Sequence, residues 1–92
     1  MRIIEEYNNY QAELIEIKSA KYIGDYAIRV FFNNGQSRLI DFKSFLESSL
    51  HPSIRKYLDE NMFKQFEIID GNLNWNDYDL IFPIDDLYEG KI

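Results

Sequence analysis

Two stretches of the chain alternate apolar and polar residues on either side of a tight-turn dipeptide. In the first, every second residue from Tyr26 to Phe32 is apolar, and the run stops just before Asn34-Gly35. This spacing predicts a half-buried strand, and Asn-Gly is the preferred pair for a two-residue type I′ hairpin loop. Such a loop sets Val30 opposite Leu39 and Phe31 opposite Arg38. The expected core face then holds Ile28, Val30, Phe32 and Leu39, and the other face holds Arg29, Phe31, Arg38 and Ile40.

The second stretch surrounds Asp70-Gly71. With this dipeptide as the loop, Ile68 lies opposite Leu73 and Phe66 lies opposite Trp75. Both apolar pairs fall on the same face of the ribbon. The turn chemistry and the hydrophobic pattern therefore predict the same hairpin register.

The N-terminal part of the chain changes its period. Over residues 1–13 the spacing of apolar residues is three to four, as in Ile3, Ile4 and Tyr7, and predicts a short helical extension. From Leu14 the pattern alternates and predicts a strand to about Tyr22, followed by a Gly24-Asp25 turn. The apolar parity changes near Ser19, which indicates a β-bulge.

Helical spacing returns after the first hairpin. Asp41 is expected to cap a helix whose apolar side is Phe42, Phe45, Leu46 and Leu50. His51-Pro52 interrupts that helix, and Ser53 is expected to cap a second short helix with Ile54, Tyr57 and Leu58 on its apolar side. After Pro83 the pattern predicts only a short turn over residues 84–88.

These elements predict an α+β fold: a small antiparallel sheet built from two hairpins, with short helices packed on one side. Residues 1–13 form an N-terminal extension and residues 14–92 one domain, because 92 residues supply a single core. The chain is 46% hydrophobic and contains seven Phe, seven Tyr and one Trp, which is ample for that core. The absence of Cys is typical of a reducing compartment, so a cytoplasmic location is expected. No apolar run approaches the length that crosses a bilayer, so no membrane association is expected.

Candidate chemistry is sparse, and no enzymatic activity, metal or cofactor is expected. The single His51 precedes a proline between helical segments, where an exposed loop imidazole is the usual outcome. Asp70, Asn72 and Asn74 have the spacing of a calcium loop, but Trp75 and Ile81 stand where that loop needs Gly and Glu. The paired acids Asp77/Asp79 and Asp85/Asp86 could serve glycoside hydrolysis only in a cleft.

Charge separates the C-terminal third from the rest. The chain has 16 acidic and 10 basic residues, and residues 65–90 contain seven acids and no Lys or Arg. A net charge of −6 repels phosphate backbones and disfavours nucleic acid as a partner. Most surface carboxylates serve solubility alone, but aromatics beside carboxylates also suit a basic protein surface. The candidate partner-binding residues are Trp75, Asp77, Tyr78, Asp79, Asp85, Asp86 and Tyr88.

Several of these segments resemble a known bacterial family, the "domain of unknown function 2442" family. The resemblance covers about residues 14–89 and includes the segment 34–42, Trp75, Asp79-Leu80, Pro83 and Leu87-Tyr88. Members usually carry a Pro-Asn-Gly type turn after the Trp, where this chain has Asn76-Asp77-Tyr78. The resemblance implies a compact α+β fold without an established activity, and some relatives are grouped as candidate antitoxin partners of small neighbouring proteins.

The sequence therefore favours a non-enzymatic protein-interaction module, whose partner is another protein or a second copy of the chain. The alternative is an antitoxin-type or transcriptional regulator associated with a small neighbouring protein. Nothing in the sequence assigns a role to residues 1–13.

Overall fold

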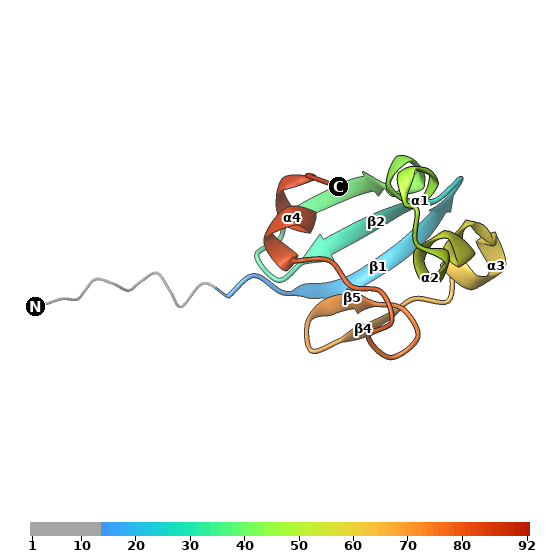
Figure 1. Cartoon of the computed structure of the whole chain (residues 1–92). Helices are drawn as coiled ribbons and strands as arrows, with labels where there is room; N and C mark the ends of the chain where they lie inside the picture. Colours follow the sequence, from blue (N-terminus) through green and yellow to red (C-terminus); the bar gives the residue numbers. More distant parts are fainter. Residues whose placement is uncertain (1–13) are drawn as a thin grey trace, which may run out of the picture.

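A computed structural model describes residues 14–92 (Figure 1). The helix expected over residues 1–13 lies outside the described residues. The described part is a mixed α+β fold with a three-stranded antiparallel sheet, a separate two-stranded hairpin and short helices, which confirms the predicted fold class.

The larger sheet has the strand order β1-β2-β3. β1 runs over Ile17–Gly24, β2 over Ala27–Phe32 and β3 over Ser37–Asp41. The pairing of β1 with β2 shifts by one residue between Ile17 and Ser19, so the predicted bulge is confirmed. A two-residue turn joins β1 to β2, since Gly24 pairs with Ala27.

The register predicted for the first hairpin is wrong by one residue. Val30 pairs with Arg38 and Phe31 with Ser37. The loop has three residues, 33–35, because the Phe32 amide donates to the Gln36 carbonyl at 2.9 Å. Gly35 has a φ of +89°, whereas Asn34 has no positive φ, so the loop is not type I′.

This shift exchanges two neighbouring side chains between the faces of β3. Ile40 is 3% exposed and joins the core, whereas Leu39, which was expected in the core, is 53% exposed. A one-residue slip has this effect because successive side chains of a strand point to opposite faces.

Four short helical segments follow β3: α1 over Lys43–Ser48, α2 over Pro52–Arg55, the 3₁₀ helix η2 over Lys56–Leu58 and α3 over Glu60–Phe63. The Asp41 carboxylate accepts a hydrogen bond from the Lys43 amide at the start of α1, although the N-cap position itself is occupied by Phe42. Two expectations are wrong. Leu50 is 90% exposed, because α1 ends before it, and Ser53 lies inside α2, whose N-cap position is occupied by His51.

The second hairpin confirms the sequence prediction. β4, Glu67–Ile69, pairs with β5, Asn72–Asn74, with Ile68 opposite Leu73. Asp70 and Gly71 both have positive φ, as a type I′ loop requires. The hairpin joins the larger sheet through the Ile17 amide, which donates to the Gly71 carbonyl at 2.7 Å. The last element, α4, spans Ile84–Glu89, where a turn was expected.

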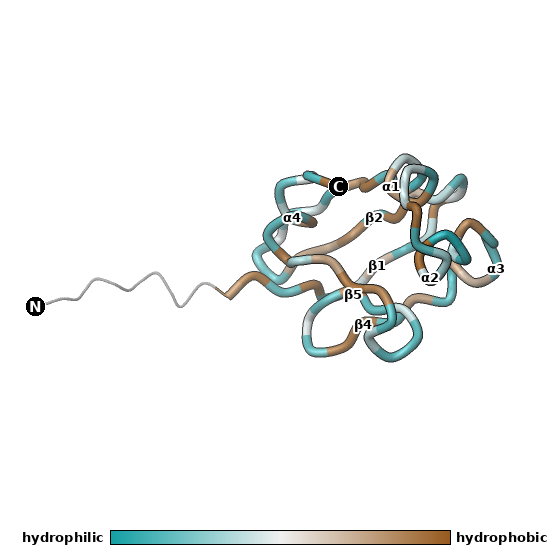
Figure 2. Tube along the Cα trace, in the orientation of Figure 1, coloured by the Kyte–Doolittle hydropathy of each residue, from teal (hydrophilic) through white to brown (hydrophobic). Residues whose placement is uncertain are grey.

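The core lies on one face of the larger sheet. Ile28, Val30 and Phe32 of β2 are buried on this face, and β2 is largely hydrophobic in Figure 2. Short helices and the β4–β5 hairpin supply the opposing side chains, among them Leu46, Phe63, Leu73 and Leu87.

Candidate functional site

The candidate partner-binding residues separate into two groups in the structure. Trp75, Asp77, Tyr78 and Asp79 belong to the segment that follows β5, beside the second hairpin. Asp85, Asp86 and Tyr88 belong to α4, which contacts β3 (Figure 1). Tyr88 is half-buried, because its ring packs edge-on against Phe32 and lies under the Arg38 guanidinium.

Trp75 is a core residue and not the exposed aromatic side chain that was expected. Its side chain is 1% exposed, and its Nε1 donates to the Phe63 carbonyl oxygen at 2.7 Å. The indole stacks on the Phe63 ring with centroids 5.5 Å apart. Edge contacts with Phe42 and Phe82 enclose it further.

The three residues after Trp75 form a left-handed turn. Asn76, Asp77 and Tyr78 have φ values of 52°, 56° and 71°. The left-handed region costs about 1–2 kcal/mol for each residue that has a Cβ, so the surroundings must hold this turn. The buried Asn74 side chain does so by accepting a hydrogen bond from the Tyr78 amide.

Asp79 closes the turn and ties it to the helical side of the molecule. Its carboxylate accepts hydrogen bonds from Lys56 Nζ at 2.7 Å and from the Tyr57 hydroxyl at 2.8 Å. The bonds from Lys56 and Tyr57 lower the pKa of Asp79. Burial, together with the adjacent Asp79 carboxylate, raises the pKa of Tyr57 to about 12. The Asp79 carboxylate therefore connects the turn to η2, and its hydrogen-bonding capacity is already used within the chain.

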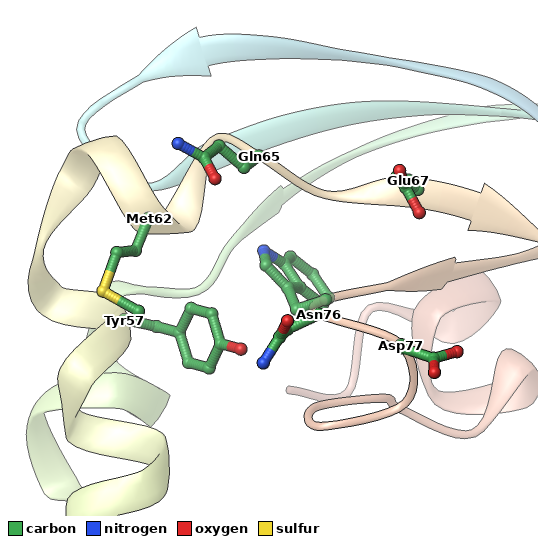
Figure 3. A pocket seen from close by; sticks show the side chains of 7 residues that line it. Tyr57, Met62, Gln65, Glu67, Asn76 and Asp77 are labelled. Atoms are coloured by element: carbon green, nitrogen blue, oxygen red, sulfur yellow. The ribbon is translucent and has the colours of Figure 1, made fainter.

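A groove of about 420 Å³ opens between the helical segments and this turn. Figure 3 shows Tyr57 and Met62 on the helical side, Glu67 on β4 and Asp77 on the turn. The carboxylates of Glu67 and Asp77 are its charged groups, and its lining contains no Lys or Arg. The lining residues are Tyr57, Met62, Gln65, Glu67, Trp75, Asn76 and Asp77.

This groove was not predicted from the sequence. Its lining combines the segment after β5 with Met62 and Gln65, which precede β4 in the chain and were not among the candidate residues. Only Asp77 and Trp75 of the candidate residues line it. The acidity of residues 65–90 was the one available signal, and Glu67 lies within that segment.

The other sequence candidates lie outside this groove. His51 is exposed at the start of α2. The calcium-like spacing belongs to the hairpin, where the Asn72 side chain donates to the Phe82 carbonyl and Asn74 is buried. Within residues 14–92, no three His, Cys, Asp or Glu side chains are grouped so as to hold a metal ion. None of the helices in this range is long and apolar enough to cross a membrane.

The fold and groove define a small α+β domain with an anionic surface depression. The chain belongs to the family "Protein of unknown function (DUF2442)", whose model matches residues 17–92. The predicted resemblance is thus confirmed, and the match begins at the first residue of β1. No curated protein and no solved structure matches the chain.

Proposed function

We propose that this chain is a non-enzymatic protein-interaction module that holds a basic side chain of a partner protein in the groove beside Asp77. The observation that carries the proposal is the composition of that groove, which has two carboxylates, an apolar side and no cation among its lining residues. Met62 is 36% exposed and offers apolar contact to the stem of a Lys or Arg side chain. Glu67 and Asp77 then receive the charged end.

The left-handed turn over residues 76–78 supports the binding of a basic side chain in the groove. The bonds to Asn74 and Asp79 hold the turn in one conformation before any partner arrives. A preformed site loses less conformational entropy on binding than a loop that must first be ordered. The carboxylates also attract a basic surface at long range, which raises the association rate at low ionic strength.

The test is capture of partners from an extract of the native host, followed by titration of the purified partner. The variant Glu67→Gln/Asp77→Asn removes both groove carboxylates and keeps the side-chain shapes. We expect its affinity to fall by about tenfold or more, since hydrogen bonds to charged groups are the stronger ones. The affinity of the wild type should weaken as salt rises.

The matched control is Asp85→Asn/Asp86→Asn, which removes two carboxylates from α4, outside the groove. This variant should bind like the wild type. Equal losses in both variants would mean that net charge alone governs binding and would refute the groove as the site. A partner that binds the groove variant unchanged would have the same consequence.

A second candidate is a regulator that contacts nucleic acid, and one feature of the sheet favours it. On the face away from the core, Lys21 pairs with Arg29, and Phe31 on the same face is 39% exposed. Basic and aromatic side chains together form the usual platform for single-stranded nucleic acid. Filter binding of a single-stranded oligonucleotide at low salt tests this candidate. Binding that the Lys21→Glu/Arg29→Glu variant loses, and the exposed-site control Lys64→Glu retains, would support it over the protein module.

A further inference from the structure

The β3 strand presents an unpaired edge of the larger sheet. The Phe32 amide donates to the Gln36 carbonyl, and the Phe42 amide donates to the Tyr26 carbonyl, both at 2.9 Å. Residues 36 and 42 therefore turn their backbone groups toward β2, and alternation gives residues 38 and 40 the same direction. Ser37, Leu39 and Asp41 point their N–H and C=O groups away from β2. No fourth strand lies beside β3 in the described part of the chain.

The side chains protect this edge only in part. Native proteins commonly block an exposed edge with Lys, Pro or an inward-pointing charge. Leu39 at the middle of β3 is instead 53% exposed, and its neighbour Phe31 on β2 is 39% exposed on the same face. The Arg38 guanidinium donates to the Ser37 carbonyl, which keeps a second lone pair for another donor.

We propose that this edge binds the β3 strand of a second copy of the chain, antiparallel, about a two-fold axis through Leu39. In that register Leu39 lies opposite the partner's Leu39, and Ser37 lies opposite the partner's Asp41. All three outward-facing residues of each strand exchange their backbone hydrogen bonds, giving six bonds in total. The interface is isologous and closes on itself, so it yields a dimer and no filament.

The neighbouring registers are less favourable, which argues for one defined pairing. Shifting the axis to residue 38 sets Arg38 directly opposite the partner's Arg38, and like charges in that position repel. Shifting it to residue 40 leaves Ser37 without a partner and reduces the hydrogen bonds to four. Only the register centred on Leu39 combines the full ladder with an apolar pair and no opposed like charges.

The size of the contact sets the expected strength. A pairing of five-residue strands buries much less than the roughly 1,200–2,000 Å² of a stable interface. The dimer should therefore be in reversible equilibrium with the monomer, with a Kd between about 10 µM and 1 mM. The edge and the groove share no residue, so dimerisation is independent of the proposed partner site.

The experiment is sedimentation equilibrium on the full chain from about 10 µM to about 1 mM, a range chosen to span that Kd. The variant Leu39→Pro removes the outward N–H and leaves the β2–β3 ladder intact, as is tolerated on an edge strand. The variant Leu39→Lys opposes two positive charges at the axis. Each should weaken dimerisation by about tenfold or more. The control is Leu50→Lys, which makes the same chemical change at a residue that is 90% exposed and outside β3.

The expected result is a concentration-dependent dimer for the wild type and the Leu50→Lys variant, and for both Leu39 variants a Kd at least about tenfold higher or no dimer within the range. Urea midpoints close to that of the wild type show that the variants are folded. A wild type that stays monomeric over the whole range overturns the proposal. Dimerisation that survives both Leu39 changes, or that is lost on Asp77→Lys, would place the contact on another surface and overturn it equally.

Discussion

Replacing Trp75 by Phe tests whether this side chain anchors the core. The change removes the Nε1 donor that bonds the Phe63 carbonyl oxygen at 2.7 Å and leaves that oxygen in a buried environment. An unsatisfied buried acceptor costs about 1–3 kcal/mol. The smaller ring also leaves a cavity of about 40 Å³, which at about 24 cal/mol per Å³ adds roughly 1 kcal/mol. The free energy of unfolding should fall by about 2–4 kcal/mol, a large part of the stability of a small domain.

Urea denaturation followed by far-ultraviolet circular dichroism measures this loss. The control is Tyr78→Phe, which removes a hydroxyl that donates to the Asp70 carboxylate from a side chain that is 51% exposed. That change should cost less than about 0.5 kcal/mol, as surface substitutions usually do. Trp75 is the single tryptophan, so its emission reports burial directly. If acrylamide quenches the native protein as strongly as the unfolded one, or if both substitutions cost the same, Trp75 is not an anchor.

Three further predictions concern the turn and the hairpin contacts. The pKa of Asp79 is lower in the folded protein than in the unfolded chain, so the ionised carboxylate stabilises the fold at pH values above the unfolded pKa. This contribution to stability disappears below about pH 4, as the pH falls through the pKa of the folded state. The melting-temperature gap between the wild type and Asp79→Asn should therefore close in acid, and a gap that is constant with pH would contradict the ion pair. The pKa of Tyr57 is raised to about 12, so its contribution is complete below about pH 10 and is lost as pH rises toward that value. Thermal melts in alkali should show a larger loss in the wild type than in Tyr57→Phe, which keeps the raised pKa values of Tyr22 and Tyr78. Gly71→Ala sets a Cβ 2.8 Å from the Glu16 side chain at a φ of +78°, whereas Gly35→Ala at +89° meets nothing within 4 Å. Both changes incur about 1–2 kcal/mol of left-handed strain, and a urea midpoint lower for Gly71→Ala than for Gly35→Ala would confirm the additional clash.

The two hairpins show what the sequence could and could not determine. Around Asp70-Gly71 the turn preference and the hydrophobic alternation require the same register, and the prediction is confirmed. After Asn34-Gly35 the neighbouring residues Leu39 and Ile40 are both apolar, so either register offers one of them to the core. The structure buries Ile40 together with Phe42, two residues further on, and this long-range packing decides the register against the Asn-Gly preference.

Trp75 illustrates a different error. The hairpin pattern assigned it to the apolar face opposite Phe66, and its ring does contact Phe66, with centroids 6.1 Å apart. Its place among the surface candidates came from the acidic composition around it. Composition averages over a strand whose two faces differ, so the alternation was the better guide to this residue.

The same distinction applies to the acids of residues 65–90. Asp70 accepts from the Tyr78 hydroxyl, Asp79 accepts from Lys56 and Tyr57, and Glu89 pairs with Lys91. These carboxylates already serve bonds within the chain, and a partner would have to displace them. Within residues 14–92, the structure shows no ion pair or side-chain hydrogen bond for the four remaining acids, Glu67, Asp77, Asp85 and Asp86. Only Glu67 and Asp77 line the groove. Glu67 and Asp77 are therefore the two acids of this segment that combine a place in the groove with no internal bond that a basic partner would have to replace.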